Sequence, residues 1–147
     1  MFLANYSDGL TDLYLPKMIE DFSRRDALAS FLSVQPRSSS MDTVHLNDDG
    51  CVQAIKSMKD SNVWVNGGYF VLRREVFSYL KPGEELVYEP FQRMISEGKV
   101  WSQRYTGFWQ CMDTFKDKQT LDELEASGTA PWRLWKNGHS AARVVAC

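Results

Sequence analysis

The chain has 147 residues, of which 44% are hydrophobic and 24% are charged, and its formal net charge is −2. This length suits one domain, and the composition excludes wholesale disorder while leaving enough apolar residues for a core. Because no basic stripe occurs, nucleic acid is not an expected partner, and an anionic substrate would need a local cation or a metal ion.

Neither a secretory leader nor a membrane span is expected. The N-terminal residues lack the basic start of a signal peptide, and no apolar run approaches the roughly 20 residues that cross a bilayer. The three cysteines lack the close spacing of a metal or redox pair, which favours free thiols in a reducing compartment. These features predict a soluble, cytoplasmic protein.

The first part of the chain predicts a strand, a helix and a second strand. Residues 2–6 form a short apolar strand, expected to be buried, that runs directly into the polar residues 7–9. Apolar residues then recur at helical spacing from Leu15 to Phe22, with Pro16 in the first turn, and residues 28–34 are again largely apolar. This order predicts a right-handed crossover onto a parallel sheet.

Turn chemistry divides the remainder of the chain. Residues 43–46 and 52–55 flank Asn47-Asp48-Asp49-Gly50 and predict a β-hairpin, in which turn formation is favoured over metal binding for the aspartates. Further strands are expected at 63–73 and 100–105, and helices at 75–80, 88–97 and 114–127. Together these elements predict an α/β domain over residues 1–136 with a mixed, mostly parallel sheet, followed by a loose tail over 137–147.

Two acidic residues are candidates for a metal site. Asp8 follows a predicted strand and precedes glycine, and α/β folds place ligands at the carboxyl ends of strands. Asp113 ends an aromatic segment and precedes a helix. Two carboxylates from distant segments suit Mg²⁺, which retains waters and gains phosphate ligands. The alternatives are an ordinary turn at Asp8, with Asp12 capping the next helix, and a helix N-cap at Asp113.

Two further segments carry side chains suited to sugar hydroxyls. Asn66 offers both a donor and an acceptor, and the adjacent Gly67 and Gly68 indicate close approach by another group. Glu89 lies at the start of a predicted helix and could accept two hydroxyl groups. A bulge packed on the core would explain the two glycines as well as a bound ligand does. A favourable interaction with the helix dipole would explain Glu89 as well as sugar binding does.

Four motifs occur in the order Tyr-Ser-Asp-Gly, Trp-Val-Asn-Gly-Gly-Tyr-Phe, Tyr-Glu-Pro-Phe and Gly-Phe-Trp-Gln-Cys-Met-Asp-Thr-Phe-Lys-Asp-Lys. From Phe2 to about Trp135 the chain resembles the glucose-1-phosphate cytidylyltransferases, within the sugar-nucleotide pyrophosphorylases. The resemblance implies a Rossmann-like nucleotide-diphospho-sugar transferase fold, of which the chain is the C-terminal portion. It also implies nucleotidyl transfer from CTP to α-D-glucose 1-phosphate, which yields CDP-glucose and pyrophosphate and would serve polysaccharide biosynthesis.

The resemblance also implies a role for each motif. The matching residues are Asp8 and Asp113 for Mg²⁺, Ser7 and Gly9 for the nucleotide, and Asn66, Gly67, Glu89 and Trp109 for the sugar. No protein nucleophile is implied, so catalysis would rest on positioning and electrostatics. The implied partners are a nucleotide and a sugar phosphate, and assembly into a homo-oligomer is typical of the relatives.

Two departures separate the chain from this family. The glycine-rich nucleotide loop is absent, and the Glu-Lys-Pro segment of relatives is replaced by residues 55–59. Lys56 and Lys59 are candidates for the phosphate contact, but their different register is consistent with a sugar phosphate other than glucose 1-phosphate. The alternatives to an active enzyme are a truncated, inactive fragment that only binds sugar phosphate, and a metal-dependent glycosyltransferase, which the context of Asp113 disfavours.

Overall fold

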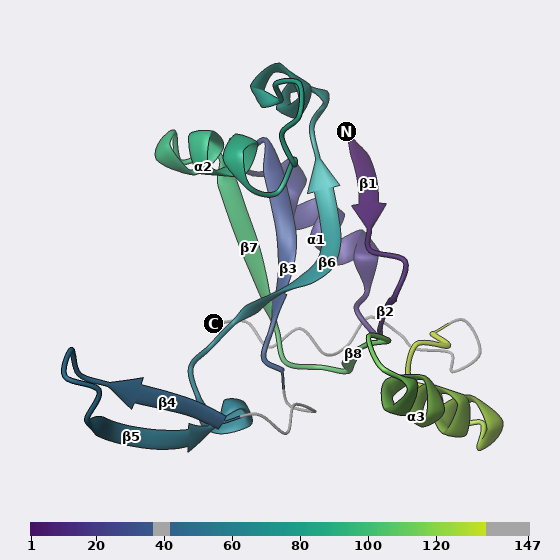
Figure 1. The fold of residues 1–147 in the computed structure, drawn as a ribbon. Helices are drawn as coiled ribbons and strands as arrows, with labels where there is room; N and C mark the ends of the chain where they lie inside the picture. The colour runs from purple at the N-terminus through teal and green to yellow at the C-terminus, as the bar shows by residue number, and fades with distance from the viewer. Residues whose placement is uncertain (37–41, 135–147) are drawn as a thin grey trace.

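A four-stranded mixed sheet forms the centre of the computed structural model, which describes residues 1–36 and 42–134 (Figure 1). In spatial order its strands are β1 (Phe2–Asn5), β6 (Val65–Leu72), β3 (Ala29–Val34) and β7 (Val100–Tyr105). The predicted α/β fold with a mixed sheet is confirmed. Strands β1, β3 and β7 share one direction, as expected. Strand β6 opposes them, however, so only one of the three pairings, β3 with β7, is parallel.

One face of the sheet is covered by the predicted first helix, α1 (Leu15–Ser23). Met18 and Phe22 lie one helical turn apart and are both buried against Leu32 and Val34 of β3. Successive residues of a strand point to opposite faces, so the alternate residues of β3 face the other side of the sheet.

The opposite face is covered by α2 (Glu89–Ser96) and by the 3₁₀-helix η2 (Arg74–Tyr79) (Figure 1). The buried side chains of this layer are Ala29, Phe70, Leu72, Val76, Phe91 and Met94. The two helical layers therefore bury both faces of the central strands β3 and β6.

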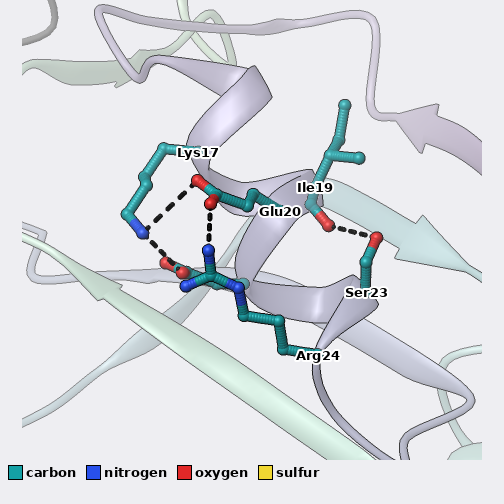
Figure 2. A network of polar contacts seen from close by, with 6 residues as sticks. Lys17, Ile19, Glu20, Ser23 and Arg24 are labelled. Atoms are coloured by element: carbon teal, nitrogen blue, oxygen red, sulfur yellow. Dashed lines mark hydrogen bonds and ion pairs between the residues drawn. The ribbon is translucent and has the colours of Figure 1, made fainter.

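The outer surface of α1 carries a set of ion pairs, which Figure 2 shows from close by. Lys17 Nζ lies 2.7 Å from Asp21 Oδ1 and 3.6 Å from Glu20 Oε2, and Arg24 also pairs with Glu20. Such solvent-exposed pairs contribute only about 0.3–0.5 kcal/mol each. They mark the solvated side of an amphipathic helix rather than a binding site.

Strand β1 is where the structure departs most from the expected burial. Leu3 is 51% exposed, and the residues that follow it in the strand are also exposed. Within the described residues, β1 lies at the edge of the sheet and pairs with β6 alone. The prediction of a buried strand is therefore right in position and wrong in burial. An apolar run indicates a strand, but it does not show which neighbours cover that strand.

The predicted crossover does connect two strands that run in the same direction, β1 and β3, but these strands are not neighbours in the sheet. Both strands are antiparallel to β6, so they run parallel to each other with β6 between them. The later segment β6 thus supplies the interstrand hydrogen bonds that the prediction assigned to a direct parallel pairing.

A short two-stranded ribbon joins regions that are far apart in the sequence. Strand β2 (Gly9–Thr11) pairs antiparallel with β8 (Trp109–Cys111). Neither strand is predicted by the residue pattern, because three residues are too few to display a period.

The predicted β-hairpin is confirmed. Strands β4 (Asp42–Leu46) and β5 (Val52–Ser57) pair antiparallel, and Gly50 has a φ of +81° in the connecting turn. This positive φ agrees with the turn-forming role of Asp48 and Asp49. The hairpin and the 3₁₀-helix η1 (Met58–Asp60) that follows it lie to one side of the central sheet (Figure 1).

The last described helix, α3 (Phe115–Ala126), matches the helix predicted over 114–127. None of the described helices combines the length and apolar character needed to cross a membrane. The tail predicted over 137–147 lies outside the described residues.

Candidate functional site

The β2–β8 ribbon brings the backbone segments of the two predicted metal ligands, Asp8 and Asp113, close together. Gly9 is paired with Cys111, and the Met112 amide donates a 2.8 Å hydrogen bond to the Asp8 carbonyl oxygen, which extends the ladder by one step. Asp8 therefore lies opposite the residue that precedes Asp113. Both aspartates are exposed at the same end of the ribbon.

The donor set at this end of the ribbon fits Mg²⁺. Across the described ranges, no cluster of three or more His, Cys, Asp or Glu side chains could hold a metal ion. Two carboxylates alone suit Mg²⁺, because this ion usually takes one or two of them and completes its octahedron with waters and substrate phosphates. Asp113 Oδ2 accepts a 3.0 Å hydrogen bond from the Cys111 thiol, and within the described residues its other oxygen has no hydrogen-bond partner.

The structure contradicts the helix-capping alternative for Asp113. The N-cap of α3 is Thr114, whose side chain accepts from the Asp117 amide, while Asp117 accepts from the Thr114 amide at 2.9 Å. This reciprocal pair is a capping box. The Asp113 carboxylate is therefore not used by the helix, which leaves it available for a ligand.

The capping alternative for Asp12 is also wrong. Helix α1 has Tyr14 at its N-cap position and no side-chain cap. Asp12 instead accepts a 2.8 Å hydrogen bond from the Phe108 amide and another from the Tyr105 hydroxyl. Burial, together with this hydrogen bond, raises the pKa of Tyr105. Asp12 thus supports the ribbon by holding the loop between β7 and β8.

Cys111 is not poised to act as a nucleophile. Burial raises the pKa of its thiol to about 12, and the hydrogen bond to Asp113 and the charge of that carboxylate act in the same direction. Because the thiolate is the reactive form, this side chain is inert near neutral pH. The structure thus gives no support for Cys111 as a nucleophile.

The glycines of β6 are explained by packing within the protein. Gly68 has a φ of +74°, and a Cβ atom there would lie 2.7 Å from the ring of Tyr6. A Cβ atom on Gly67 would lie 3.2 Å from the side chain of Leu32. The close approach predicted for this segment is therefore made by Tyr6 and Leu32, which supports the bulge interpretation.

Asn66 supports that bulge and also lines a hollow. Its Oδ1 atom accepts a 2.9 Å hydrogen bond from the Gly68 amide. The same side chain lines a hollow of about 360 Å³ together with six other residues, which are Tyr6, Phe31, Val87, Tyr88, Phe91 and Ile95. This volume lies at the small end of the range for ligand pockets.

One short segment of the chain connects the hollow with the acidic end of the ribbon. Strands β1 and β3 run in the same direction, so their carboxyl ends lie at the same end of the sheet, where antiparallel β6 begins. Tyr6 follows β1 directly and Asp8 comes two residues later, so one short segment reaches both places. Ligands of open α/β sheets bind outside the carboxyl ends of the strands.

The remaining residues predicted for the nucleotide and sugar lie in different settings. Ser7 is exposed in the turn before β2, whereas Gly9 is buried and its carbonyl accepts a 2.7 Å hydrogen bond from the Tyr69 hydroxyl. Trp109 donates its indole N–H to the Gly67 carbonyl at 2.9 Å, so it ties β8 to β6. Glu89 is exposed in the first turn of α2, directly after Tyr88.

Lys56, one of the two lysines predicted for the phosphate, is not among the described residues that line the hollow. Lys56 is exposed on β5, in the hairpin beside the sheet (Figure 1). The Lys59 side chain lies outside the part of the chain that the structure describes.

Sequence reasoning missed most of the hollow. Tyr6 and Tyr88 belong to the motifs that contain Asp8 and Glu89, so their position in those motifs was an available signal. The apolar residues Phe31, Phe91 and Ile95 carry no such signal, because they look like ordinary core residues in the sequence.

Relatives with curated names match the chain over nine tenths of its length. The chain is 28% identical over 136 residues to a probable glucose-1-phosphate cytidylyltransferase of Bacillus subtilis, covering 91% of the chain and 53% of that protein. It is 30% identical over 139 residues to the glucose-1-phosphate cytidylyltransferase of Salmonella typhi, covering 92% and 52%. The resemblance predicted from the four motifs is thus confirmed, and the chain spans about half the length of the curated relatives it matches.

Solved structures decide the fold. A protein from Bacillus anthracis assigned as a glucose-1-phosphate thymidylyltransferase superposes with a TM-score of 0.58 at 18% identity, covering 83% of the chain and 53% of that protein. The inositol-1-phosphate CTP transferase of T. maritima gives 0.52 at 19% identity, covering 95% and 58%. The chain has the sugar-nucleotidyltransferase fold. No family model matches the sequence. Within this fold, the acidic ribbon end and the hollow form the candidate site.

Proposed function

We propose that this chain carries the metal-binding and sugar-phosphate-binding part of a nucleotidyltransferase that makes CDP-glucose and pyrophosphate from CTP and α-D-glucose 1-phosphate. The observation that supports this most directly is the backbone pairing that sets Asp8 opposite the neighbour of Asp113, two residues after Tyr6, which lines the hollow with Asn66. The match to curated cytidylyltransferases supports the choice of CTP and glucose 1-phosphate.

The chain's own residues would act by binding and orientation. Asp8 and Asp113 would hold Mg²⁺, which when bound supplies positive charge to neutralise the nucleotide phosphates. Ser7 and Gly9 would contact the nucleotide beside these acids, and Asn66 and Glu89 would hold sugar hydroxyls. Trp109 and Gly67 would shape the sugar site through their mutual hydrogen bond.

Positioning accounts for the chemistry in this proposal. A phosphate oxygen of the sugar phosphate attacks the α-phosphorus of CTP, a new P–O bond forms, and the bond to the leaving pyrophosphate breaks. No side chain forms a covalent intermediate, which agrees with the inert thiol of Cys111. Holding the two substrates in line can supply a large part of the rate enhancement.

A second candidate function is binding of a sugar phosphate without transfer. The observation that favours it is that the matched relatives are about twice as long as the part they share with this chain. Residues needed for the nucleotide could then lie in the part of the relatives that the chain does not match.

One experiment tests these candidates together. The 147-residue chain is titrated with α-D-glucose 1-phosphate by calorimetry, with and without Mg²⁺, and pyrophosphate release is then measured after addition of CTP. For the chain by itself we expect binding that Mg²⁺ strengthens and no release of pyrophosphate. Release would favour the complete transfer reaction, whereas absence of sugar-phosphate binding would rule out both candidates.

A further inference from the structure

The fourth motif of the sequence contains a second acidic residue, Asp117, to which the proposed function gives no role. Asp117 lies in the first turn of α3, four residues after the candidate metal ligand Asp113. Both of its carboxylate oxygens accept hydrogen bonds. Oδ2 accepts from the amide and the hydroxyl of Thr114, at 2.9 Å and 2.7 Å, and Oδ1 accepts from the side-chain amide of Gln110 at 3.1 Å. One side chain thus holds residues on both sides of Asp113.

Capping of α3 explains only part of this arrangement. A capping box needs the bond from the Thr114 amide to Asp117, together with the reciprocal bond from the Asp117 amide to the Thr114 hydroxyl. It does not need Gln110, which belongs to β8 rather than to the helix. Gln110 is 7% exposed, and its backbone is paired with Leu10 of β2. The bond between Gln110 and Asp117 therefore connects the helix to the ribbon.

These hydrogen bonds enclose the short connection that carries Asp113. Asp113 belongs to neither β8 nor α3, and its side chain is exposed. Within the connection, the Cys111 thiol donates to Asp113 Oδ2 at 3.0 Å. A ligand on an unanchored connection would have to be ordered when a metal ion binds, at a cost in conformational entropy. Because Asp117 anchors the connection at both ends, much of this ordering is already present without the ion.

Asp117 is suited to this task because its carboxylate is ionised. Its hydrogen bonds, above all the bond to the Thr114 side chain, hold the pKa of Asp117 below its ordinary value. Hydrogen bonds to an ionised acceptor are stronger than those between neutral groups. Across residues 1–36 and 42–134, no cluster of three or more acidic, histidine or cysteine side chains could hold a metal ion. Asp117 is therefore placed to act through Asp113 rather than as a third ligand.

We propose that Asp117 is a positioning residue for the metal ligand Asp113, and that it acts by clamping the connection between Gln110 and Thr114. This inference rests on the proposed function, since it assumes that Asp113 binds Mg²⁺. Residues that orient metal ligands through hydrogen bonds typically change the metal affinity by about 10–100-fold when they are replaced. The clamp gives the acidic residue at the end of the fourth motif a role that helix capping alone does not.

The test measures binding of Mg²⁺ alone to the 147-residue chain by NMR, from the shifts of the Asp8 and Asp113 amide signals. Asp117→Ala removes both halves of the clamp and is expected to raise the Kd for Mg²⁺ about tenfold. Asp122→Ala is the matched control, because Asp122 is an exposed aspartate of the same helix that pairs with a lysine. It is expected to change the Kd by less than about twofold, since solvent screens the loss of an exposed charge.

Two further variants separate the clamp from the charge of Asp117 and from helix capping. Asp117→Asn removes the charge, but its oxygen can still accept from Thr114 while its amide donates to a turned Gln110 side chain. Its Kd is expected to stay within about threefold of the native value, because both halves of the clamp are retained. Gln110→Met leaves the capping box intact, breaks the bond to the ribbon and is expected to raise the Kd at least about fivefold. Circular dichroism verifies that each variant is folded.

The outcomes distinguish this inference from the function on which it rests. A native Kd in Asp117→Ala would overturn the inference, and so would equal losses in Asp117→Asn and Asp117→Ala, which would assign the effect to charge. Both results leave the proposed function in place, and these two variants decide the question even if the buried change Gln110→Met prevents folding. If Mg²⁺ shifted neither the Asp8 nor the Asp113 signal of the native chain, the proposed metal site and this inference would both be wrong.

Discussion

The acidic end of the ribbon and the apolar hollow are connected by the short segment from Tyr6 to Asp8, yet they are built differently. Asp8 and Asp113 are exposed side chains carried by a short ribbon whose strands have only three residues each. The hollow contains Phe91, which is 5% exposed and belongs to the buried layer under α2. Changes in the hollow should therefore affect folding and binding together, whereas changes at the acidic ribbon end should affect binding alone.

The largest effect on stability is expected for Phe91→Ala. This substitution removes an aromatic side chain from the core and should lower the free energy of unfolding by about 3–5 kcal/mol. Urea denaturation measures the loss. Phe115→Ala is the matched control, since Phe115 is 81% exposed at the start of α3, and its change should stay within about 0.5 kcal/mol. If both variants lost a similar free energy of unfolding, the hollow would not be more important for folding than the ribbon side of the molecule.

A smaller but clear loss is expected for Gly68→Ala. The positive φ costs an alanine about 1–2 kcal/mol, and the contact of its Cβ atom with Tyr6 adds to that cost, for a total of about 3 kcal/mol. Gly128→Ala separates the two causes, because Gly128 has a φ of +72° and no atom within 4 Å of the added Cβ. Only about 1 kcal/mol should be lost there, and equal losses in the two denaturation curves would show that the Tyr6 contact costs nothing.

On the ribbon side, Thr114→Ala removes the N-cap of α3. The expected loss is about 1 kcal/mol, because the Asp117 amide loses its acceptor and the capping box is broken. The comparison variant Thr114→Ser retains a hydroxyl acceptor and should recover most of this stability in thermal unfolding. Failure of serine to restore it would show that the threonine acts through its methyl group.

The smallest effect on stability is expected when both candidate metal ligands are changed. In the double variant Asp8→Asn with Asp113→Asn, the free energy of unfolding should change by no more than about 0.5 kcal/mol, since both side chains are exposed. Strengthening of glucose 1-phosphate binding by Mg²⁺ should disappear in calorimetry.

Asp48→Asn is the control for this double variant, because Asp48 is an exposed aspartate in the hairpin turn. It should leave the Mg²⁺ effect unchanged. A double variant that still responds to Mg²⁺ would remove the metal assignment, and a strongly destabilised one would show that the acidic ribbon end supports the fold after all.

The sequence by itself determined the elements whose signals are local. The helical spacing of Met18 and Phe22, the Asp-Gly turn at Gly50 and the strong apolar run of β3 all appear in the structure near their predicted positions. The order of four short motifs also predicted the fold, because such an order is rare by chance. The helix, turn and strand signals depend on neighbouring residues alone, and the motif order depends on resemblance to a family, so neither requires knowledge of the tertiary structure.

Only the tertiary structure decided how these elements meet. It placed β6 between β1 and β3, left β1 at an edge, and paired two three-residue strands so that Asp8 lies opposite the neighbour of Asp113. It also showed that Thr114, rather than Asp113, caps α3. Strand pairing is set by backbone hydrogen bonds between distant segments, and the identity of the paired partners leaves almost no trace in the residues of either strand.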